Sequence, residues 1–154
     1  MREILFRGKC VQTDEWVKGS LIIDECNRYY IGRAVIPSSP VSFGAMHSRQ
    51  NGKTRDRFIG IGFVMVYPET VGEFTGCTDK FGFDIYEGDI VDILTENEEY
   101  GVIAYDDGGF QVEADGFILD FHSNINGADL EIIGNVHDNP GMLEGADDEK
   151  QKMP

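Results

Sequence analysis

The sequence lacks the patterns that mark export, membrane insertion and disulfide or zinc frameworks. Only three of its 154 residues are cysteines, they form no C-x-x-C pair, and they are Cys10, Cys26 and Cys77. Because they are few, odd in number and widely spaced, we expect reduced thiols that are mostly buried or half-buried. No apolar run of signal-peptide length follows Met1, and no stretch approaches the ~18 apolar residues of a spanning helix. We therefore expect a soluble cytoplasmic protein that does not bind membranes.

Positive charge is also scarce, with 13 Lys plus Arg against 28 Asp plus Glu, which gives a formal net charge of −15. This balance argues against a general nucleic-acid coat protein and against adhesion to an anionic membrane. A hydrophobic fraction of 41% is enough for a folded core, in one domain or two small modules. The acidic excess confers solubility or presents a negative surface to a basic host protein, even as a mimic of nucleic acid. The acidic groups are Glu96-Glu98-Glu99, Asp106-Asp107 and Asp147-Asp148-Glu149.

Motifs for phosphate binding and nucleophilic catalysis are missing too. There is no Walker loop, and Gly60-Ile61-Gly62 lacks the third glycine and the following helix of a dinucleotide site. Ser123 follows His122 without a G-x-S-x-G elbow, and no spacing supports zinc binding by His122 or His137. We predict no catalytic residues, no metal, no cofactor and no enzymatic activity.

Two acidic clusters have a structural and a functional interpretation. Around Gly88, Glu87 and Asp89 could form a carboxylate pair for metal binding or acid–base work, since residues two apart on a strand share a face. We favour the structural interpretation. In it, Gly88 takes a backbone conformation that other residue types cannot adopt, and the Asp89 side chain accepts hydrogen bonds from nearby backbone amides. Asp106-Asp107-Gly108-Gly109 lacks the spacing of a calcium loop and predicts a hairpin turn.

What the chain does contain is short β-branched and aromatic runs separated by turns, with 19 glycines and no long helical stripe. We predict a mainly β fold with little helix. The predicted N-terminal strands are Ile4–Phe6, Trp16–Ile23, Tyr29–Ile31, Ala34–Ile36 and Phe58–Tyr67. Five close-spaced strands follow, as in a small barrel: Ile90–Leu94, Gly101–Tyr105, Phe110–Glu113, Phe117–Phe121 and Leu130–Val136. Pro68–Phe74 predicts a short helix or a tight turn.

Several blocks of the sequence resemble the YopX family. They are Ile4–Lys9 with Trp16–Gly19, Val71–Gly82, Ile85–Val91 and Glu131–Pro140. The family is typical of phages and prophages of Gram-positive bacteria, and the resemblance implies an SH3-like β-barrel in the C-terminal half. It brings no mechanism, because the family has no established activity or catalytic residues to carry over. Cys77 stands where an apolar Leu is more usual, and Phe81 and Phe83 stand where small polar residues are common.

Three regions are therefore expected. Residues 1–67 form an N-terminal β region with an exposed basic loop at 47–57, which is a loop or an extended hairpin with its tip at Asn51-Gly52. Residues 68–140 form the SH3-like barrel. Residues 141–154 form an acidic, disordered tail.

The favoured function is that of a non-catalytic, phage- or prophage-encoded module that binds a host or phage protein or a second copy of itself. Its expected contact residues are aromatic and acidic groups at loop tips: Tyr86, Tyr105, Asp106, Asp107 and Phe110. One alternative is nucleic-acid or phosphate binding by the basic loop. That site would consist of Arg49, Lys53, Arg55 and Arg57, with Arg28 and Arg33 as additions. A less favoured alternative is an enzyme of unknown class that uses Glu87, Asp89 or His137.

Overall fold

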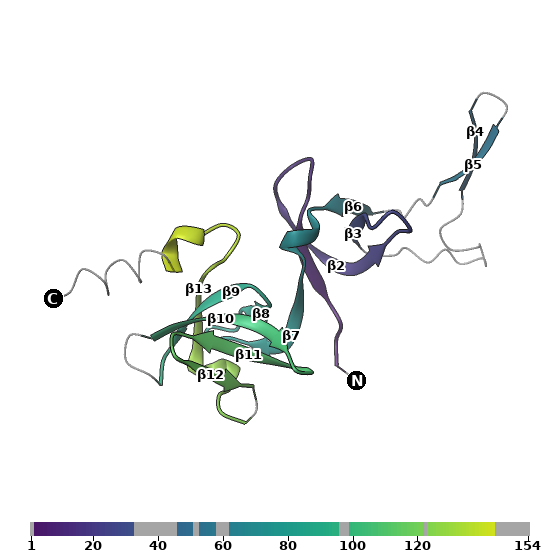
Figure 1. The fold of residues 1–154 in the computed structure, drawn as a ribbon. Coiled ribbons are helices and arrows are strands. Elements are labelled where there is room, and N and C mark those ends of the chain that lie inside the picture. Colours follow the sequence, from purple (N-terminus) through teal and green to yellow (C-terminus); the bar gives the residue numbers. More distant parts are fainter. Residues whose placement is uncertain are drawn as a thin grey trace. The chain divides into compact units, whose positions relative to one another are not determined.

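The structure is a computed structural model that describes residues 2–32, 46–50, 53–57, 62–95, 99–121 and 123–143. For 46–50 and 53–57 it describes the backbone. The chain divides into two compact units. The N-terminal unit is Leu5–Val71, and the C-terminal unit combines Met1–Ile4 with Gly72–Pro154. Strands dominate both units (Figure 1), so the prediction of a mainly β protein is confirmed.

The N-terminal unit is built on four antiparallel strands in the order β6-β3-β2-β1. They are β1 (Phe6–Lys9), β2 (Trp16–Ile23), β3 (Tyr29–Gly32) and β6 (Phe63–Val66). The small core of this unit includes Ile31 and Val66, which are 0% and 1% exposed. Gly8 allows both to pack closely, because a Cβ there would lie 3.1 Å from each side chain.

Two predicted strands of this unit differ in their bounds from those observed, and a third is not described. The first strand starts at Phe6 rather than at Ile4, which is 56% exposed and belongs to the other unit. Of the strand predicted over Phe58–Tyr67, the structure describes β6, and Gly62, with a positive φ of 84°, forms a turn directly before it. Positions 58–61, and the predicted strand Ala34–Ile36, lie outside the described residues.

Of the two structures predicted for Pro68–Phe74, the short helix is wrong and the tight turn agrees better with what is observed. A single 3-10 turn, η1 (Pro68–Thr70), is followed directly by strand β7 (Gly72–Thr78). The Thr70 hydroxyl donates to the Tyr67 carbonyl at 2.6 Å and accepts the Lys9 amide at 2.9 Å. These hydrogen bonds end the helical conformation at Thr70, after a single turn.

The predicted basic loop forms a two-stranded antiparallel hairpin. β4 (Met46–Gln50) pairs with β5 (Lys53–Arg57), from Met46 opposite Arg57 to Gln50 opposite Lys53. The residues expected at its tip, Asn51 and Gly52, lie outside the described residues.

The C-terminal unit contains a five-stranded antiparallel sheet in the order β12-β11-β10-β9-β13. The strands are β9 (Asp89–Ile93), β10 (Glu99–Asp106), β11 (Gly109–Ala114), β12 (Phe117–Asp120) and β13 (Leu130–Asn135). These are the five close-spaced strands that the sequence predicts. The unit also contains the pair of β7 with β8 (Asp84–Tyr86) and a second 3-10 turn, η2 (Gly127–Asp129).

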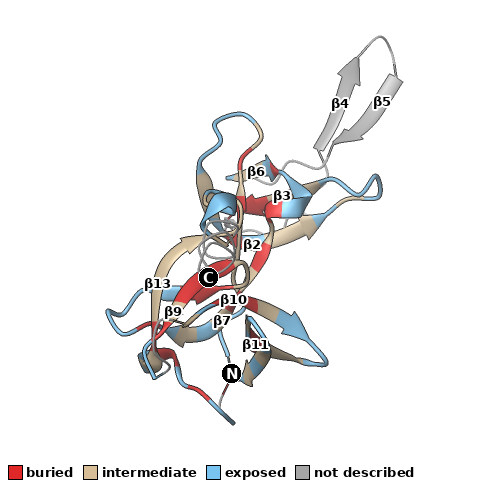
Figure 2. Ribbon diagram, turned by 60° about the vertical axis from the view of Figure 1, so that its left-hand side comes forward, coloured by how far each residue is buried: buried red, intermediate tan, exposed pale blue. Residues whose placement is uncertain are grey.

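One apolar core holds this unit together, and β9, which is buried along most of its length, contributes Val91 and Ile93 to it (Figure 2). Its buried members are Ile85, Val91, Ile93, Ile103, Val112, Phe121, Ile125 and Leu130. The hydrogen-bonded sheet is open, because β12 and β13 occupy its two edges. Strand closure of a barrel is therefore not observed.

The C-terminal tail is described over its first residues only. Residues 140–143 form one helical turn. The rest of the predicted tail, residues 144–154, lies outside the described residues.

Candidate interaction site

The tight hairpin between β10 and β11 positions several of the predicted contact residues. Its two-residue turn consists of Asp107 and Gly108, with φ of 50° and 80°. Both values are positive, as in the type I′ turns that match the twist of flanking strands. Tyr105 and Phe110 face each other across the ladder, with ring centroids 5.1 Å apart in an edge-on arrangement. The hairpin end is therefore held by both its turn and an aromatic pair.

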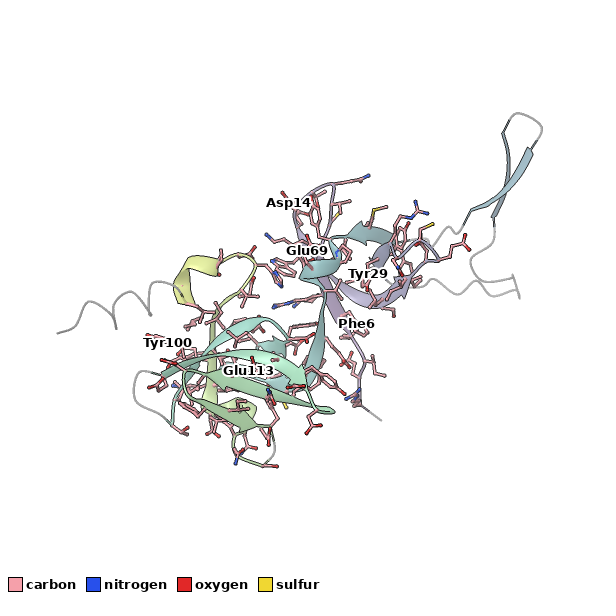
Figure 3. All side chains as sticks on the ribbon, viewed as in Figure 1. Phe6, Asp14, Tyr29, Glu69, Tyr100 and Glu113 are labelled. Carbon is pink, nitrogen blue, oxygen red and sulfur yellow. The ribbon has the colours of Figure 1, made fainter. Side chains whose placement is uncertain are left out.

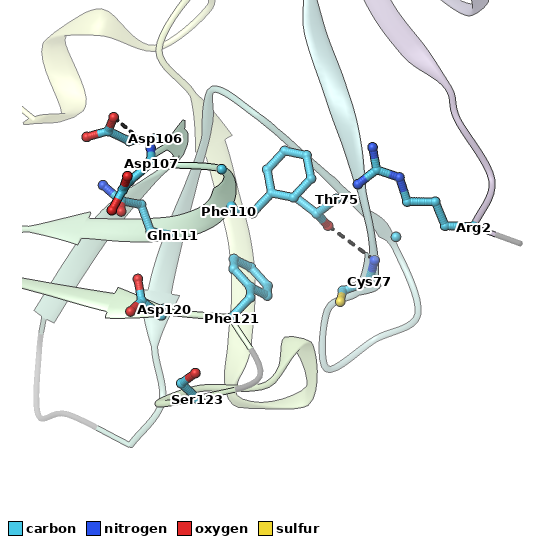
Figure 4. A pocket seen from close by; sticks show the side chains of 13 residues that line it. Arg2, Thr75, Cys77, Asp106, Asp107, Phe110, Gln111, Asp120, Phe121 and Ser123 are labelled. Carbon is cyan, nitrogen blue, oxygen red and sulfur yellow. Dashed lines mark hydrogen bonds between the residues drawn. The ribbon is translucent and has the colours of Figure 1, made fainter.

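A hollow of about 550 Å³ opens between this hairpin, β7 and the end of β12 (Figure 4). All of its lining belongs to the C-terminal unit. The lining residues are Arg2, Thr75, Gly76, Cys77, the hairpin residues Asp106 to Gln111, Asp120, Phe121 and Ser123.

The hollow combines aromatic walls with carboxylates. Phe110 is half-buried and offers part of its ring, whereas Phe121 is 9% exposed, belongs to the core and forms the floor beneath it. Three exposed aspartates also line the hollow: Asp106, Asp107 and Asp120. This arrangement suits a side chain that has an apolar stem and a cationic end.

Hydrogen bonds fix the β7 side of the hollow, where the Cys77 thiol offers an apolar surface. The Thr75 hydroxyl donates to the Ile85 carbonyl at 2.8 Å and accepts the Cys77 amide at 3.2 Å. Burial raises the pKa of the Cys77 thiol above its ordinary value of 9.0, against a smaller opposing effect of the Thr75 hydroxyl. The thiol is therefore neutral near pH 7 and acts as apolar surface.

Arg2 is the cation in the lining. Its guanidinium donates to a carboxylate oxygen of Glu73 at 3.3 Å, and its side chain is 63% exposed. An exposed pair of this kind contributes little to stability.

The hollow brings together three of the five predicted contact residues, namely Asp106, Asp107 and Phe110. Tyr105 is 48% exposed and contacts Phe110, but it does not line the hollow. Tyr86, predicted at a loop tip, instead lies in the core, where it is 1% exposed with its ring centroid 5.5 Å from that of Phe74. Ile85 and Tyr86 are both buried although they are neighbours on β8, so alternation along the strand does not apply there.

The sequence did not reveal the other half of the lining. Arg2, Cys77 and Phe121 come from distant parts of the chain and meet only in the folded unit. The one local signal for these lining residues is that Asp120 and Phe121 stand at the end of a predicted strand. Nothing near Arg2 indicated its position.

The Glu87-Gly88-Asp89 turn has the predicted structural features. Gly88 has a φ of 91°, and the buried Asp89 accepts the Tyr86 amide at 2.8 Å. Burial raises the pKa of the Glu87 carboxyl, and the nearby charge of Glu73 raises it further, while amide hydrogen bonds from Glu73 and Tyr105 lower it.

The structure describes the remaining candidates only in part. His122 and Arg33 lie outside the described residues, and the backbone alone is described for Arg49, Lys53, Arg55 and Arg57. Ser123 lines the hollow, and the His137 amide donates to Asn135 Oδ1 at 3.0 Å. Arg28 is paired with Asp24 at 2.7 Å.

Two further findings concern the described part of the chain. Within it, no three His, Cys, Asp or Glu side chains are grouped so that they could hold a metal ion. Nor does any helix in those segments have the length and apolar character needed to cross a membrane.

Comparison with known proteins places the chain in a family and a fold. Residues 5–144 match the family model described as YopX protein. No curated protein matches the chain. Among solved structures, the chain is similar to the crystal structure of protein EF1440 from Enterococcus faecalis, with a TM-score of 0.53 and 20% sequence identity. That similarity covers 93% of this chain and 99% of the other, and at this identity it shows the fold alone.

Proposed function

This chain belongs to the YopX family, and from that premise we propose that it is a non-catalytic protein-interaction module. We further propose that it is encoded by a phage or prophage and acts in the cytoplasm of the bacterial host. The observation that carries the interaction function is the hollow of the C-terminal unit, because it joins aromatic walls to carboxylates.

The chemistry of the hollow indicates the kind of partner segment. Phe110 offers apolar contact area above the buried Phe121. Three aspartates, Asp106, Asp107 and Asp120, offer acceptors for a cation. A Lys or Arg beside an apolar residue on the partner would use both. Because the turn and the Tyr105–Phe110 pair hold the hairpin, little conformational entropy would be lost on binding.

We also propose that the C-terminal unit is an SH3-like barrel. Five short antiparallel strands around a single core support this assignment. Small barrels commonly bind partners at loops and grooves near the ends of strands, and the hollow lies at such a place.

The test is affinity capture from bacterial lysate with the full chain, run with and without nuclease. The variant D106N/D107N/D120N removes the carboxylates of the hollow and keeps their size. The control D14N/E25Q/E69Q makes the same change of charge at three exposed acidic residues of the N-terminal unit. We expect a nuclease-resistant protein to be captured by the wild type and the control and about tenfold less by the hollow variant. Equal capture by all three would contradict the proposal.

Nucleic-acid binding by the β4–β5 hairpin is the second candidate, and the register favours it. Lys53, Arg55 and Arg57 occupy alternate positions of β5 and therefore belong to one face of the ribbon. Their partners in the register are Gln50, Ser48 and Met46, so that face carries three cations and no carboxylate. A two-stranded ribbon has dimensions that fit the major groove of DNA.

The matched variants for this candidate are K53A/R55A/R57A and R49A, since Arg49 belongs to the opposite face with Thr54. Binding of duplex DNA should fall steeply with salt and should be lost in the triple variant while R49A keeps most of it. Absence of binding at low salt would eliminate this candidate.

A further inference from the structure

The turn between β7 and β8 carries the two most exposed large apolar side chains among the described residues. Phe81 is 60% exposed and Phe83 is 67% exposed. Lys80 precedes them, and its Nζ lies 5.4 Å from the centroid of the Phe81 ring. We refer to Lys80–Phe83 as the aromatic tip.

The aromatic tip is held rigidly by one buried carboxylate. Asp79 Oδ1 accepts the amides of Phe81 and Phe83, both at 2.9 Å. Its Oδ2 accepts the Ile132 amide of β13 at 3.1 Å, and the Lys80 amide donates to the Leu130 carbonyl at 2.9 Å. Gly82, with a φ of 86°, allows the chain to reverse between the two rings.

Fold stability does not account for two phenylalanines at this position. Single exposed apolar residues are common on protein surfaces, and Tyr100 at the start of β10 is one (Figure 3). The tip differs because two rings and a cation share a loop that is already ordered. Aromatic side chains that lose little entropy on burial are the usual anchors of protein interfaces.

The aromatic tip and the hollow are chemically complementary. The tip offers two aromatic rings and the ammonium group of Lys80. The hollow offers the half-buried ring of Phe110 above the buried Phe121, together with three aspartates, and its one cation, Arg2, is paired with Glu73. Both features belong to the C-terminal unit, so each copy of the chain carries one of each.

We propose that the aromatic tip of one copy docks into the hollow of a second copy, which makes the chain a partner for itself. This inference rests on the proposed function, because it uses the same hollow and names its occupant. The contact joins two different surfaces, so copies would add head to tail and form a ring or an open chain. Alternatively, two copies could each place their tip in the other's hollow and form a two-fold symmetric dimer.

The test uses two variants that each destroy one surface. F81S/F83S removes the rings of the tip, which are mostly exposed, and D106N/D107N/D120N neutralises the hollow. L94S is the control, since Leu94 is 41% exposed and lies in a different turn. Molar mass is measured by light scattering after size exclusion, with protein concentrations up to about 1 mM, the range of weak complexes.

Wild type and L94S should self-associate, whereas each surface variant alone should remain monomeric, with its association weakened about 30-fold or more. Mixing the two variants should restore a complex that stops at one copy of each, because only one intact tip and one intact hollow remain. Assembly of either variant alone, or a monomeric wild type, would overturn the inference.

Failure of this inference can be told apart from failure of the proposed function. If the wild type is monomeric but its hollow still captures another protein, the hollow binds a different partner and only self-docking is wrong. If F81S/F83S and the wild type both capture nothing, the proposed function fails as well.

Discussion

At the scale of single residues, Asp79 does the most to present the aromatic tip. It is 5% exposed, and its carboxylate accepts three backbone amides, from Phe81, Phe83 and Ile132. The last of these lies on β13, an edge strand whose free amides would otherwise invite pairing with another chain. One side chain thus shapes the tip and satisfies one amide of an edge strand.

Replacing Asp79 by Ala should therefore destabilise the C-terminal unit. Three amides would lose their acceptor, which should lower the free energy of unfolding by about 3 kcal/mol. Asp79→Asn keeps one acceptor oxygen and should cost less. Urea denaturation followed by circular dichroism measures the effect, and an Ala variant as stable as the wild type would show that the tip is not held by this carboxylate.

Glu87 should make stability depend on pH in a defined direction. Burial raises the pKa of its carboxyl above the ordinary value of 4.5, so the folded state binds this proton more tightly than the unfolded chain does. The ionised carboxylate therefore costs stability, and this cost is absent below pH 4.5 and complete above the folded pKa.

Glu87→Gln removes the charge and keeps an acceptor for the Tyr105 and Glu73 amides. Thermal unfolding should show the variant more stable than the wild type at about pH 8, with the difference disappearing towards about pH 4. A difference that is constant with pH, or one of opposite sign, would mean that Glu87 is stabilised as an anion.

At the scale of elements, the β10–β11 hairpin depends on one glycine. Gly108 has a φ of 80°, whereas its neighbour Gly109 has no positive φ and has open space where a Cβ would lie. Since the left-handed region is costly for residues other than Gly, only one of these two glycines is required by the backbone.

Gly108→Ala should lower the free energy of unfolding by about 1–2 kcal/mol, while Gly109→Ala should stay within about 0.5 kcal/mol of the wild type. The pair is compared by thermal unfolding, because the two substitutions add the same methyl group one residue apart. Equal effects of the two substitutions would contradict the turn conformation described for Asp107-Gly108.

Local chemistry predicted this hairpin and the Gly88-Asp89 turn, because Asp and Gly are the residues that such turns require. It did not predict that Tyr86 is buried. Strand β8 buries both Ile85 and Tyr86, and its pairing with β7 has an irregular register. It did not predict the hollow either. Arg2 and Phe121 are brought together by the fold, and no periodicity in the sequence reports such a meeting.

At the scale of the whole molecule, charge opposes the association of copies. A net charge of −15 on each chain produces long-range repulsion, while the proposed contact brings Lys80 to carboxylates over a short distance. Salt screens the long-range term most strongly, because the Debye length is about 10 Å at 0.1 M.

Self-association should therefore strengthen when NaCl is raised from about 20 mM to about 300 mM. Sedimentation velocity of the wild type at matched concentrations measures this change. Association that weakens steadily with salt would show that local ion pairs, rather than aromatic contact, dominate the interface.

The most direct test of the account is an NMR titration of the hollow in the isotope-labelled F81S/F83S chain. Three synthetic peptides of equal length serve as probes, one with Lys and Phe, one with Lys and Ser, and one with Glu and Phe. We predict that the Lys and Phe peptide alone shifts the amide signals of Gly108, Phe110 and Phe121. If all three peptides leave these signals unchanged, or if the shifts lie elsewhere on the chain, the hollow is not the interaction site.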